Sequence, residues 1–223
     1  AFAEFVNIPQ HILYRIPENV SFTQAAMVEP AAVAAHAVNL SCINWNDNVV
    51  VAGTGIIGLF IIQIARSQGC GNIFAIDIDN FKLEKAKNLG ADYVINPHFE
   101  NVPDRIMELT SGRGADVVFE AAGLQETVGI SIDSARKGGT VVLVGNISPV
   151  VQIPLQAVVT RQVRIQGSCA LCGEYSAVLD MMARGEVNVE SLLSAEAPLS
   201  EGAEWFKKLY RKESQLLKVV LKP

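Results

Sequence analysis

The sequence is poor in residues that disulfide frameworks, metal centres and nucleic-acid-binding surfaces need. Its 223 residues include 3 histidines and 4 scattered cysteines, which are Cys42, Cys70, Cys169 and Cys172. The scatter excludes a disulfide scaffold and favours a reducing cytoplasm. With 18 basic against 23 acidic residues, the formal net charge is −5. Nucleic acid is therefore not an expected partner.

Two features invite a metal or membrane interpretation. Cys169 and Cys172 have CxxC spacing, but a zinc site also needs a second pair or histidines, and His11, His36 and His98 are dispersed. Two small, semi-buried thiols are the simpler interpretation.

No charged residue occurs between positions 49 and 65. That glycine-interrupted run is shorter than the ~20 apolar residues that span a bilayer, so no membrane association is expected.

Residues 48–77 predict a dinucleotide-binding βαβ unit. A β-branched run leads into GTGIIG at residues 53–58, and an apolar helix and a second strand follow. Gly53 allows the tight turn, Gly55 lets the backbone approach a pyrophosphate, and Gly58 lets the helix pack on the sheet. The pyrophosphate is expected at the helix N-terminus, where free N–H groups attract an anion.

Asp77 indicates which dinucleotide is bound. It lies 19 residues beyond Gly58, at the end of the second strand. A carboxylate there accepts hydrogen bonds from the adenosine ribose and repels a 2′-phosphate, so NAD is expected rather than NADP. A glycine-rich turn without a ligand is the alternative, which the strand, the helix and the acid together argue against.

Strand-like and helix-like segments alternate through the middle of the chain. Strands are expected at residues 49–52, 73–76, 93–94, 117–120, 140–144 and 163–166, with helices between them and an alanine-rich helix beginning near Pro30. This alternation predicts an α/β fold, a doubly wound parallel six-stranded Rossmann sheet with strand order 3-2-1-4-5-6.

The two ends of the chain depart from this pattern. Residues 1–17 alternate like a strand, and an initial Ala1 suggests that the chain begins inside a structure. After Gly167 we expect a helix near 174–184, an extended stretch at 195–198, a charged helix at 201–211 and a last strand at 217–221. That last strand is expected to join the elements of the N-terminal segment instead of the parallel sheet.

These segments resemble the medium-chain dehydrogenase/reductase superfamily, in particular its zinc-dependent polyol and threonine dehydrogenase branch. The resemblance is carried by FTQAAMVEPAAVAAHAV, VVVAGTGIIGLFIIQIA, AIDIDNFKLEKAKNLGAD, DVVFEAAG, GGTVVLVGN and KVVLKP. It implies a Rossmann domain at 31–168, with remnants of a GroES-like catalytic domain at 1–30 and 169–223. The first half of the catalytic domain would be missing.

The resemblance also implies cofactor contacts. Gly53, Gly55, Ile56, Ile57 and Gly58 match the phosphate turn, and Asp77, Ile78 and Lys82 match the adenosine ribose site. The segments beside the nicotinamide correspond to Ala121, Ala122, Gly123, Val144, Gly145, Asn146, Ser168 and Cys169.

A catalytic zinc is implied as well. In the family it polarises the substrate hydroxyl while a hydride passes to nicotinamide, and a cysteine, a His-Glu pair and a glutamate in Val-Glu-Pro hold it. Glu29 alone has a counterpart here, as catalytic and metal residue. Favourable interaction with the helix dipole is the alternative explanation for Glu29.

The expected function is NAD-dependent, zinc-dependent oxidation of a secondary alcohol, which is a sugar alcohol or a polyol phosphate. This chain is expected to bind the cofactor better than it catalyses the reaction. Ala170 and Leu171 replace the arginine and tyrosine of sorbitol-type enzymes, which leaves the alcohol open. Alternatives are a zinc-independent NADPH quinone or enoyl reductase and a non-catalytic NAD-binding module. A homodimer or homotetramer through the edge strand near 163–167 is also expected, because an unpaired edge is a liability.

Overall fold

The computed structural model describes residues 2–211 and 215–223, so Ala1 lies outside the described residues. The chain forms two compact units. Residues 30–174 form one, which we call the sheet unit. Residues 1–29 together with 175–223 form the other, the terminal unit.

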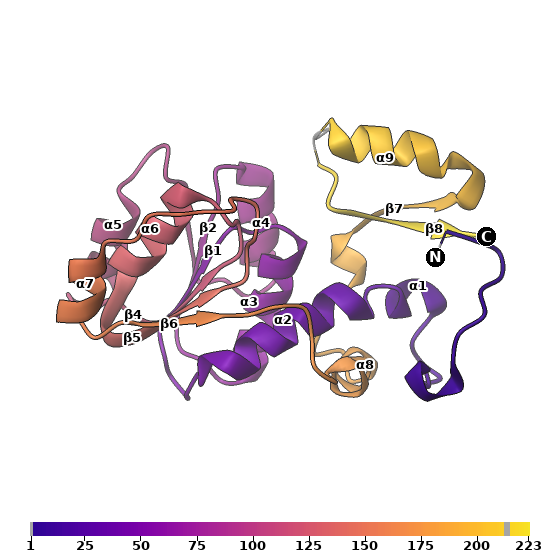
Figure 1. Cartoon of the computed structure of the whole chain (residues 1–223), viewed down its shortest axis with the longest axis horizontal. Helices are drawn as coiled ribbons and strands as arrows, with labels where there is room; N and C mark the ends of the chain where they lie inside the picture. Colours follow the sequence, from indigo (N-terminus) through magenta and orange to yellow (C-terminus); the bar gives the residue numbers. More distant parts are fainter. Residues whose placement is uncertain (1, 212–214) are drawn as a thin grey trace. The chain divides into compact units, whose positions relative to one another are not determined.

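The sheet unit is built on a six-stranded parallel sheet (Figure 1). Its strands lie in the order β3-β2-β1-β4-β5-β6, which confirms the predicted α/β fold and strand order. Their bounds are β1 (Val49–Ala52), β2 (Ile73–Ile76), β3 (Tyr93–Ile95), β4 (Ala115–Glu120), β5 (Ala135–Leu143) and β6 (Arg164–Gly167). Every residue of β1, β2 and β4 is buried, as expected for parallel strands with both faces covered.

Helices follow the strands as the sequence pattern predicts. They are α2 (Val28–Ser41), which enters the unit from the terminal unit, α3 (Ile56–Ser67), α4 (Asn80–Asn88), α5 (Val102–Leu109), α6 (Gln125–Ser134) and α7 (Leu155–Thr160). Helix α3 packs beside α4, and α5 beside α6. Residues 58–65 of α3 are all buried, which explains their lack of charge. Among the described residues, no helix combines the length and apolar character needed to cross a membrane.

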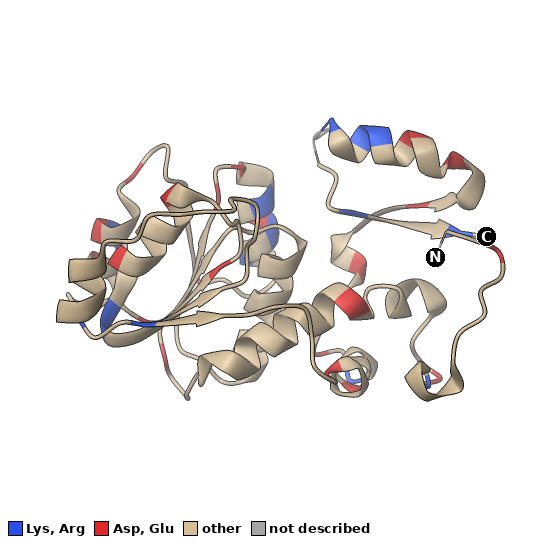
Figure 2. Ribbon diagram, in the orientation of Figure 1, with Lys and Arg blue, Asp and Glu red and all other residues tan. Residues whose placement is uncertain are grey.

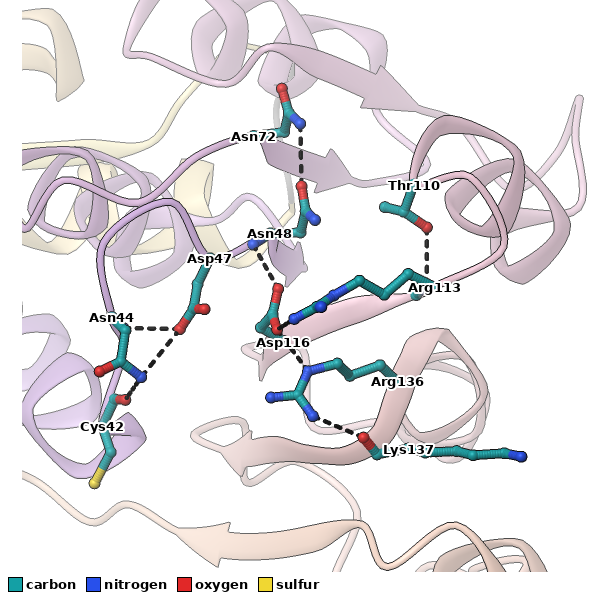
Figure 3. A network of polar contacts seen from close by, with 11 residues as sticks. Cys42, Asn44, Asp47, Asn48, Asn72, Thr110, Arg113, Asp116, Arg136 and Lys137 are labelled. Atoms are coloured by element: carbon teal, nitrogen blue, oxygen red, sulfur yellow. Dashed lines mark hydrogen bonds and ion pairs between the residues drawn. The ribbon is translucent and has the colours of Figure 1, made fainter.

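A polar network joins the strands at their amino-terminal ends (Figure 3). The Asp116 side chain, 3% exposed, pairs with Arg113 and Arg136 and accepts a 2.9 Å hydrogen bond from Asn48 N–H. Asn72 Nδ2 donates to Asn48 Oδ1 at 3.0 Å. Burial raises the pKa of Asp116, but the hydrogen bonds from Arg136, Asn48 and Arg113 outweigh burial, and the pKa is lowered. The carboxylate thus connects the starts of β1, β4 and β5.

The terminal unit contains a second, smaller sheet. Strand β7 (Leu193–Pro198) pairs in parallel with β8 (Lys218–Lys222), and the helices are α1 (Phe22–Ala25), α8 (Tyr175–Ala183) and α9 (Gly202–Tyr210). The last strand therefore lies in the unit of the N-terminal segment, as predicted. Figure 2 shows charges of both signs along α9, where Lys208 Nζ lies 3.3 Å from a Glu204 oxygen.

The predicted strand over residues 1–17 is wrong. The described residues 2–17 contain no strand, and a single 3-10 turn occurs at Gln10–Ile12. A strand requires a ladder of paired N–H and C=O groups, and Pro9 and Pro17 have no N–H to donate. Helix α1, in contrast, was not predicted. Its signal is a capping box, in which Ser21 and Gln24 exchange hydrogen bonds of 2.7 and 3.2 Å.

Candidate functional site

A cleft of about 300 Å³ opens at the carboxyl ends of the strands of the sheet unit. Ligands of doubly wound sheets bind at this end, where the strand order reverses, and here the reversal falls between β1 and β4. The sequence-predicted residues that line the cleft are Gly53, Gly55, Asp77, Ile78, Lys82, Ala121 and Ala122. Its remaining lining, which sequence reasoning did not single out, is Ile76, Pro97, Leu124, Thr127, Ile130 and Ile147.

Three loops pack backbone against backbone beside this cleft. A Cβ on Gly53, whose φ is +97°, would lie 2.9 Å from Ala122 N, and one on Gly58 would lie 2.0 Å from Gly53 O. A Cβ on Gly145 would lie 2.0 Å from Gly123 N. Real Cβ atoms do not approach that closely, so the loops that follow β1, β4 and β5 can meet here because these positions are glycine.

Gly55 differs from these glycines. It caps the N-terminus of α3, and a Cβ built on it meets no atom within 4 Å. The N–H groups of Ile56 and Ile57 follow in the first helical turn, where the helix itself supplies no backbone acceptor for them. Packing against the described residues therefore does not require glycine at position 55, and its role in leaving room for an anion at the helix N-terminus stays a prediction.

Asp77 is held by the glycine turn from β1. Its Oδ2 accepts hydrogen bonds from Thr54 N–H at 2.8 Å and from Thr54 Oγ1 at 3.1 Å. Its Oδ1 accepts one from Asp79 N–H at 3.0 Å. Thr54 is fully buried, whereas Asp77 is half-buried and lines the cleft. The carboxylate thus orders the turn and faces the candidate ligand site.

Glu120 organises the turn after β4, and sequence reasoning missed its role. This side chain is fully buried, and Oε1 accepts hydrogen bonds from Ala122 N–H at 3.0 Å, Gly123 N–H at 2.8 Å and the Thr127 hydroxyl at 2.6 Å. The backbone C=O of Glu120 accepts from Gly145 N–H at 2.9 Å. A charged residue at the end of a buried strand was the signal that could have found it.

The predicted residues after β5 and β6 have different surroundings. Val144 N–H donates to Glu120 O at 2.8 Å, and Asn146 N lies beside Gly123 in the packed loops. Ser168 N–H donates to Leu143 O at 2.9 Å and so extends the edge of the sheet. Neither Ser168 nor Cys169 is among the described residues that line the cleft.

The interpretation of Cys169 and Cys172 as semi-buried thiols is wrong, because both are exposed. The segment turns at Ala170, whose φ is +52°, and the thiols follow it out to solvent. Cys70 is buried instead, and burial raises the pKa of its thiol to about 11. A thiol with that pKa stays protonated and unreactive at neutral pH.

The described residues do not fit a catalytic zinc. Glu29 lies in the first turn of α2, and no group of three or more histidine, cysteine, aspartate or glutamate side chains gathers in the described chain as a metal site would require. The Nδ1 atom of His36 lies 2.8 Å from Glu174 Oε1, within the sheet unit. Burial raises the pKa of Glu174, while hydrogen bonds with His36 and Cys172 N–H outweigh burial and lower it. His36 therefore has a structural partner.

Comparison with known proteins agrees with this architecture. The family described as zinc-binding dehydrogenase matches residues 57–184, more than half of the chain. Sorbitol dehydrogenase of Ovis aries is 32% identical over 212 residues, which are 94% of this chain and 59% of the relative. The chain thus spans about three fifths of the length of this relative.

Solved structures agree in fold. 2R,3R-butanediol dehydrogenase from Bacillus subtilis superimposes with a TM-score of 0.94 at 30% identity, over 100% of this chain and 64% of that protein. A zinc-binding dehydrogenase from Sinorhizobium meliloti 1021, solved with NADP, gives a TM-score of 0.93 at 29% identity, over 100% of this chain and 66% of that protein. Because the family match covers more than half of the chain and the Rossmann sheet is present, the chain belongs to the zinc-binding dehydrogenases of the medium-chain dehydrogenase/reductase superfamily.

Proposed function

We propose that this chain binds NAD in the cleft and is the cofactor-binding part of an enzyme that oxidises a secondary alcohol. The observation that carries the proposal is the Asp77 carboxylate in the cleft, fixed to the glycine turn by Thr54. A carboxylate at this position favours the free ribose diol of NAD. When bound, NAD supplies the acceptor for the hydride that leaves the alcohol carbon.

Several turns and loops of the sheet unit bind or orient the cofactor in this reaction. The first turn of α3 holds the pyrophosphate through its free N–H groups, and Gly55 leaves space for it. Asp77 accepts a hydrogen bond from the adenosine ribose. Glu120 fixes the turn at residues 121–123, which with the loop at 144–146 orients the nicotinamide half. The family resemblance adds Ser168 and Cys169 as contacts to the nicotinamide carboxamide. A zinc-binding role of Glu29 remains a sequence-based prediction.

We infer that the substrate is a polyol or a polyol phosphate. The relatives support this class through their names, because sorbitol and 2,3-butanediol are both secondary alcohols with adjacent hydroxyl groups.

A reductase that prefers NADPH is the second candidate. Two observations favour it, the NADP in the Sinorhizobium meliloti relative and Lys82 in the lining of the cleft, whose positive charge would attract a 2′-phosphate. Asp77 opposes it, because two negative groups would meet in a half-buried site. The hydrogen bonds that hold Asp77 in place make us favour NAD.

Calorimetric titration separates the two candidates. The 223-residue chain is expected to bind NADH at least about tenfold more tightly than NADPH, a difference of about 1.4 kcal/mol. Asp77→Asn should reduce the preference for NADH over NADPH, because it removes the charge that repels the 2′-phosphate. Lys82→Ala should leave this preference the same or make it larger, because it removes a charge that attracts the 2′-phosphate. Equal affinities, or a preference for NADPH, would favour the reductase.

We also propose a homodimer through the edge strand β6. This strand ends the strand order, and Ser168 N–H donates inward to Leu143 O. Because successive N–H groups of a strand alternate in direction, those of Ile165 and Gly167 point outward, toward the side on which a second copy could pair. Exposed apolar side chains in the connection from β5 to β6 support the same interface, and they are Val150, Ile153, Leu155 and Val159.

Light scattering at micromolar concentration tests the dimer. Ile165→Pro, which removes an outward N–H, and Leu155→Asp, which places a charge on a side chain that is 64% exposed, should both give monomers. Phe99→Asp is the matched control, because Phe99 is 80% exposed but follows β3 at the other edge of the sheet. A monomeric wild-type chain would contradict the proposal.

A further inference from the structure

Thr54 occupies the variable position between two glycines of the turn, yet it makes a specific contact 23 residues away. Its side chain is fully buried, and its hydroxyl and its N–H both donate to the same atom, Asp77 Oδ2. A buried hydroxyl needs a partner, and a carboxylate is the strongest acceptor available to it. The contact therefore fixes the Asp77 carboxylate before any ligand arrives.

The hydrogen bonds of Asp77 leave little capacity for a ligand. A carboxylate has about four acceptor positions, two on each oxygen. Thr54 fills both positions on Oδ2, and Asp79 N–H fills one on Oδ1. Among the described residues, these hydrogen bonds leave one acceptor position on Oδ1 for the ribose. The chain thus presents a carboxylate of fixed orientation with a single open acceptor.

We propose that Thr54 is a specificity-determining residue, whose hydroxyl prevents the Asp77 carboxylate from turning away from the ribose and so excludes a 2′-phosphate. A carboxylate free to rotate could move its charge away from a phosphate or admit a screening water. Rotation of the Asp77 carboxylate breaks two hydrogen bonds to Thr54 in a partly buried environment. The inference rests on the proposed binding of NAD in the cleft.

The role of the hydroxyl can be separated from that of the backbone. The Thr54 N–H donates in every variant, so a substitution changes one of the two bonds. Thr54→Val has nearly the same shape and leaves no cavity, but it places a methyl group against Oδ2. Thr54→Ser restores the hydroxyl, and Thr54→Ala removes it without adding bulk.

The test is calorimetric titration of the full chain and its variants with ADP-ribose and with ADP-ribose 2′-phosphate, which lack the nicotinamide ring. The wild-type chain should prefer ADP-ribose by at least about tenfold. Thr54→Val and Thr54→Ala should reduce this preference about fivefold, and Thr54→Ser should stay within about twofold of wild type. In an Asp77→Asn background, Thr54→Val should change the preference no further, because the two residues act as one unit.

The outcomes distinguish this inference from the function on which it rests. Thr110→Val is the control, because its hydroxyl also bonds within the sheet unit, at 2.7 Å to Ile106 O, but lies in the amino-terminal network. The inference alone is overturned if Thr54→Val and Thr54→Ala leave the wild-type preference unchanged, or if they weaken the binding of both ligands equally. A wild-type chain that binds neither ligand, or prefers the 2′-phosphate, overturns the proposed NAD site as well. If Thr54→Val does not fold, Thr54→Ala decides.

Discussion

Gly55→Ala is expected to weaken NADH binding in a protein that still folds, whereas Gly58→Ala is expected to destabilise the fold itself. A Cβ at position 58 would lie 2.0 Å from Gly53 O, so Gly58→Ala should lower the free energy of unfolding by about 3 kcal/mol through overpacking. A Cβ at position 55 meets nothing within 4 Å, so Gly55→Ala should fold normally. That Cβ fills the space proposed for the pyrophosphate, and binding should weaken by about 100-fold or more.

Thermal unfolding and NADH titration of the same samples measure both effects. Gly129→Ala is the matched control, because a Cβ on this α6 glycine also meets nothing within 4 Å. It should leave NADH binding unchanged and stabilise the protein by up to about 1 kcal/mol through helix propensity. If Gly55→Ala bound NADH as tightly as the wild type, the helix N-terminus would not be the pyrophosphate site.

The second large effect concerns metal and activity. The 223-residue chain is expected to hold no tightly bound zinc and to oxidise polyols far below enzyme-like rates, while still binding NADH. A catalytic zinc needs three protein ligands, and the described residues bring no such group together. Without a Lewis acid, the developing alkoxide is not stabilised.

Elemental analysis after dialysis and polyol-dependent NADH formation test this expectation. Glu29→Gln should change neither zinc content nor NADH binding in this chain, because one carboxylate cannot hold the ion alone. The opposite result is also informative. One zinc per chain that disappears in Glu29→Gln would show that Glu29 binds zinc together with further ligands, and the conclusion that the described residues do not fit a catalytic zinc would be wrong.

Sequence reasoning succeeded where the fold makes the pattern obligatory. Parallel strands buried on both faces must be continuous apolar runs, and the glycine turn needs glycine where backbones meet, as at Gly53 and Gly58. Both constraints are visible in the local sequence, without knowledge of which segments pack against the strand or the turn. The strand order followed from the same regular alternation.

The misses involve contacts that depend on how the folded backbone brings groups together. An alternating pattern at 2–17 describes any extended chain, whereas a strand also needs a neighbour with free hydrogen-bonding groups. The dinucleotide motif leaves the position of Thr54 unspecified, so its hydrogen bond to Asp77 could not be inferred. Likewise, the three hydrogen bonds to Glu120 Oε1 depend on how the turn after β4 folds back on the strand.

The glycine contacts between the loops after β1, β4 and β5 have a mechanical consequence. Where side chains separate two loops, a small shift of one is absorbed by a change of rotamer in the other. Between Gly53 and Ala122, and between Gly145 and Gly123, backbone atoms meet directly, and no side chain is available to absorb a displacement. A shift of the phosphate turn must therefore be passed on to the turn at 121–123 and from there to the loop after β5. In the proposed complex with NAD, the adenosine and nicotinamide ends of the cleft are therefore expected to respond as one body, so that occupancy of one end constrains the geometry of the other.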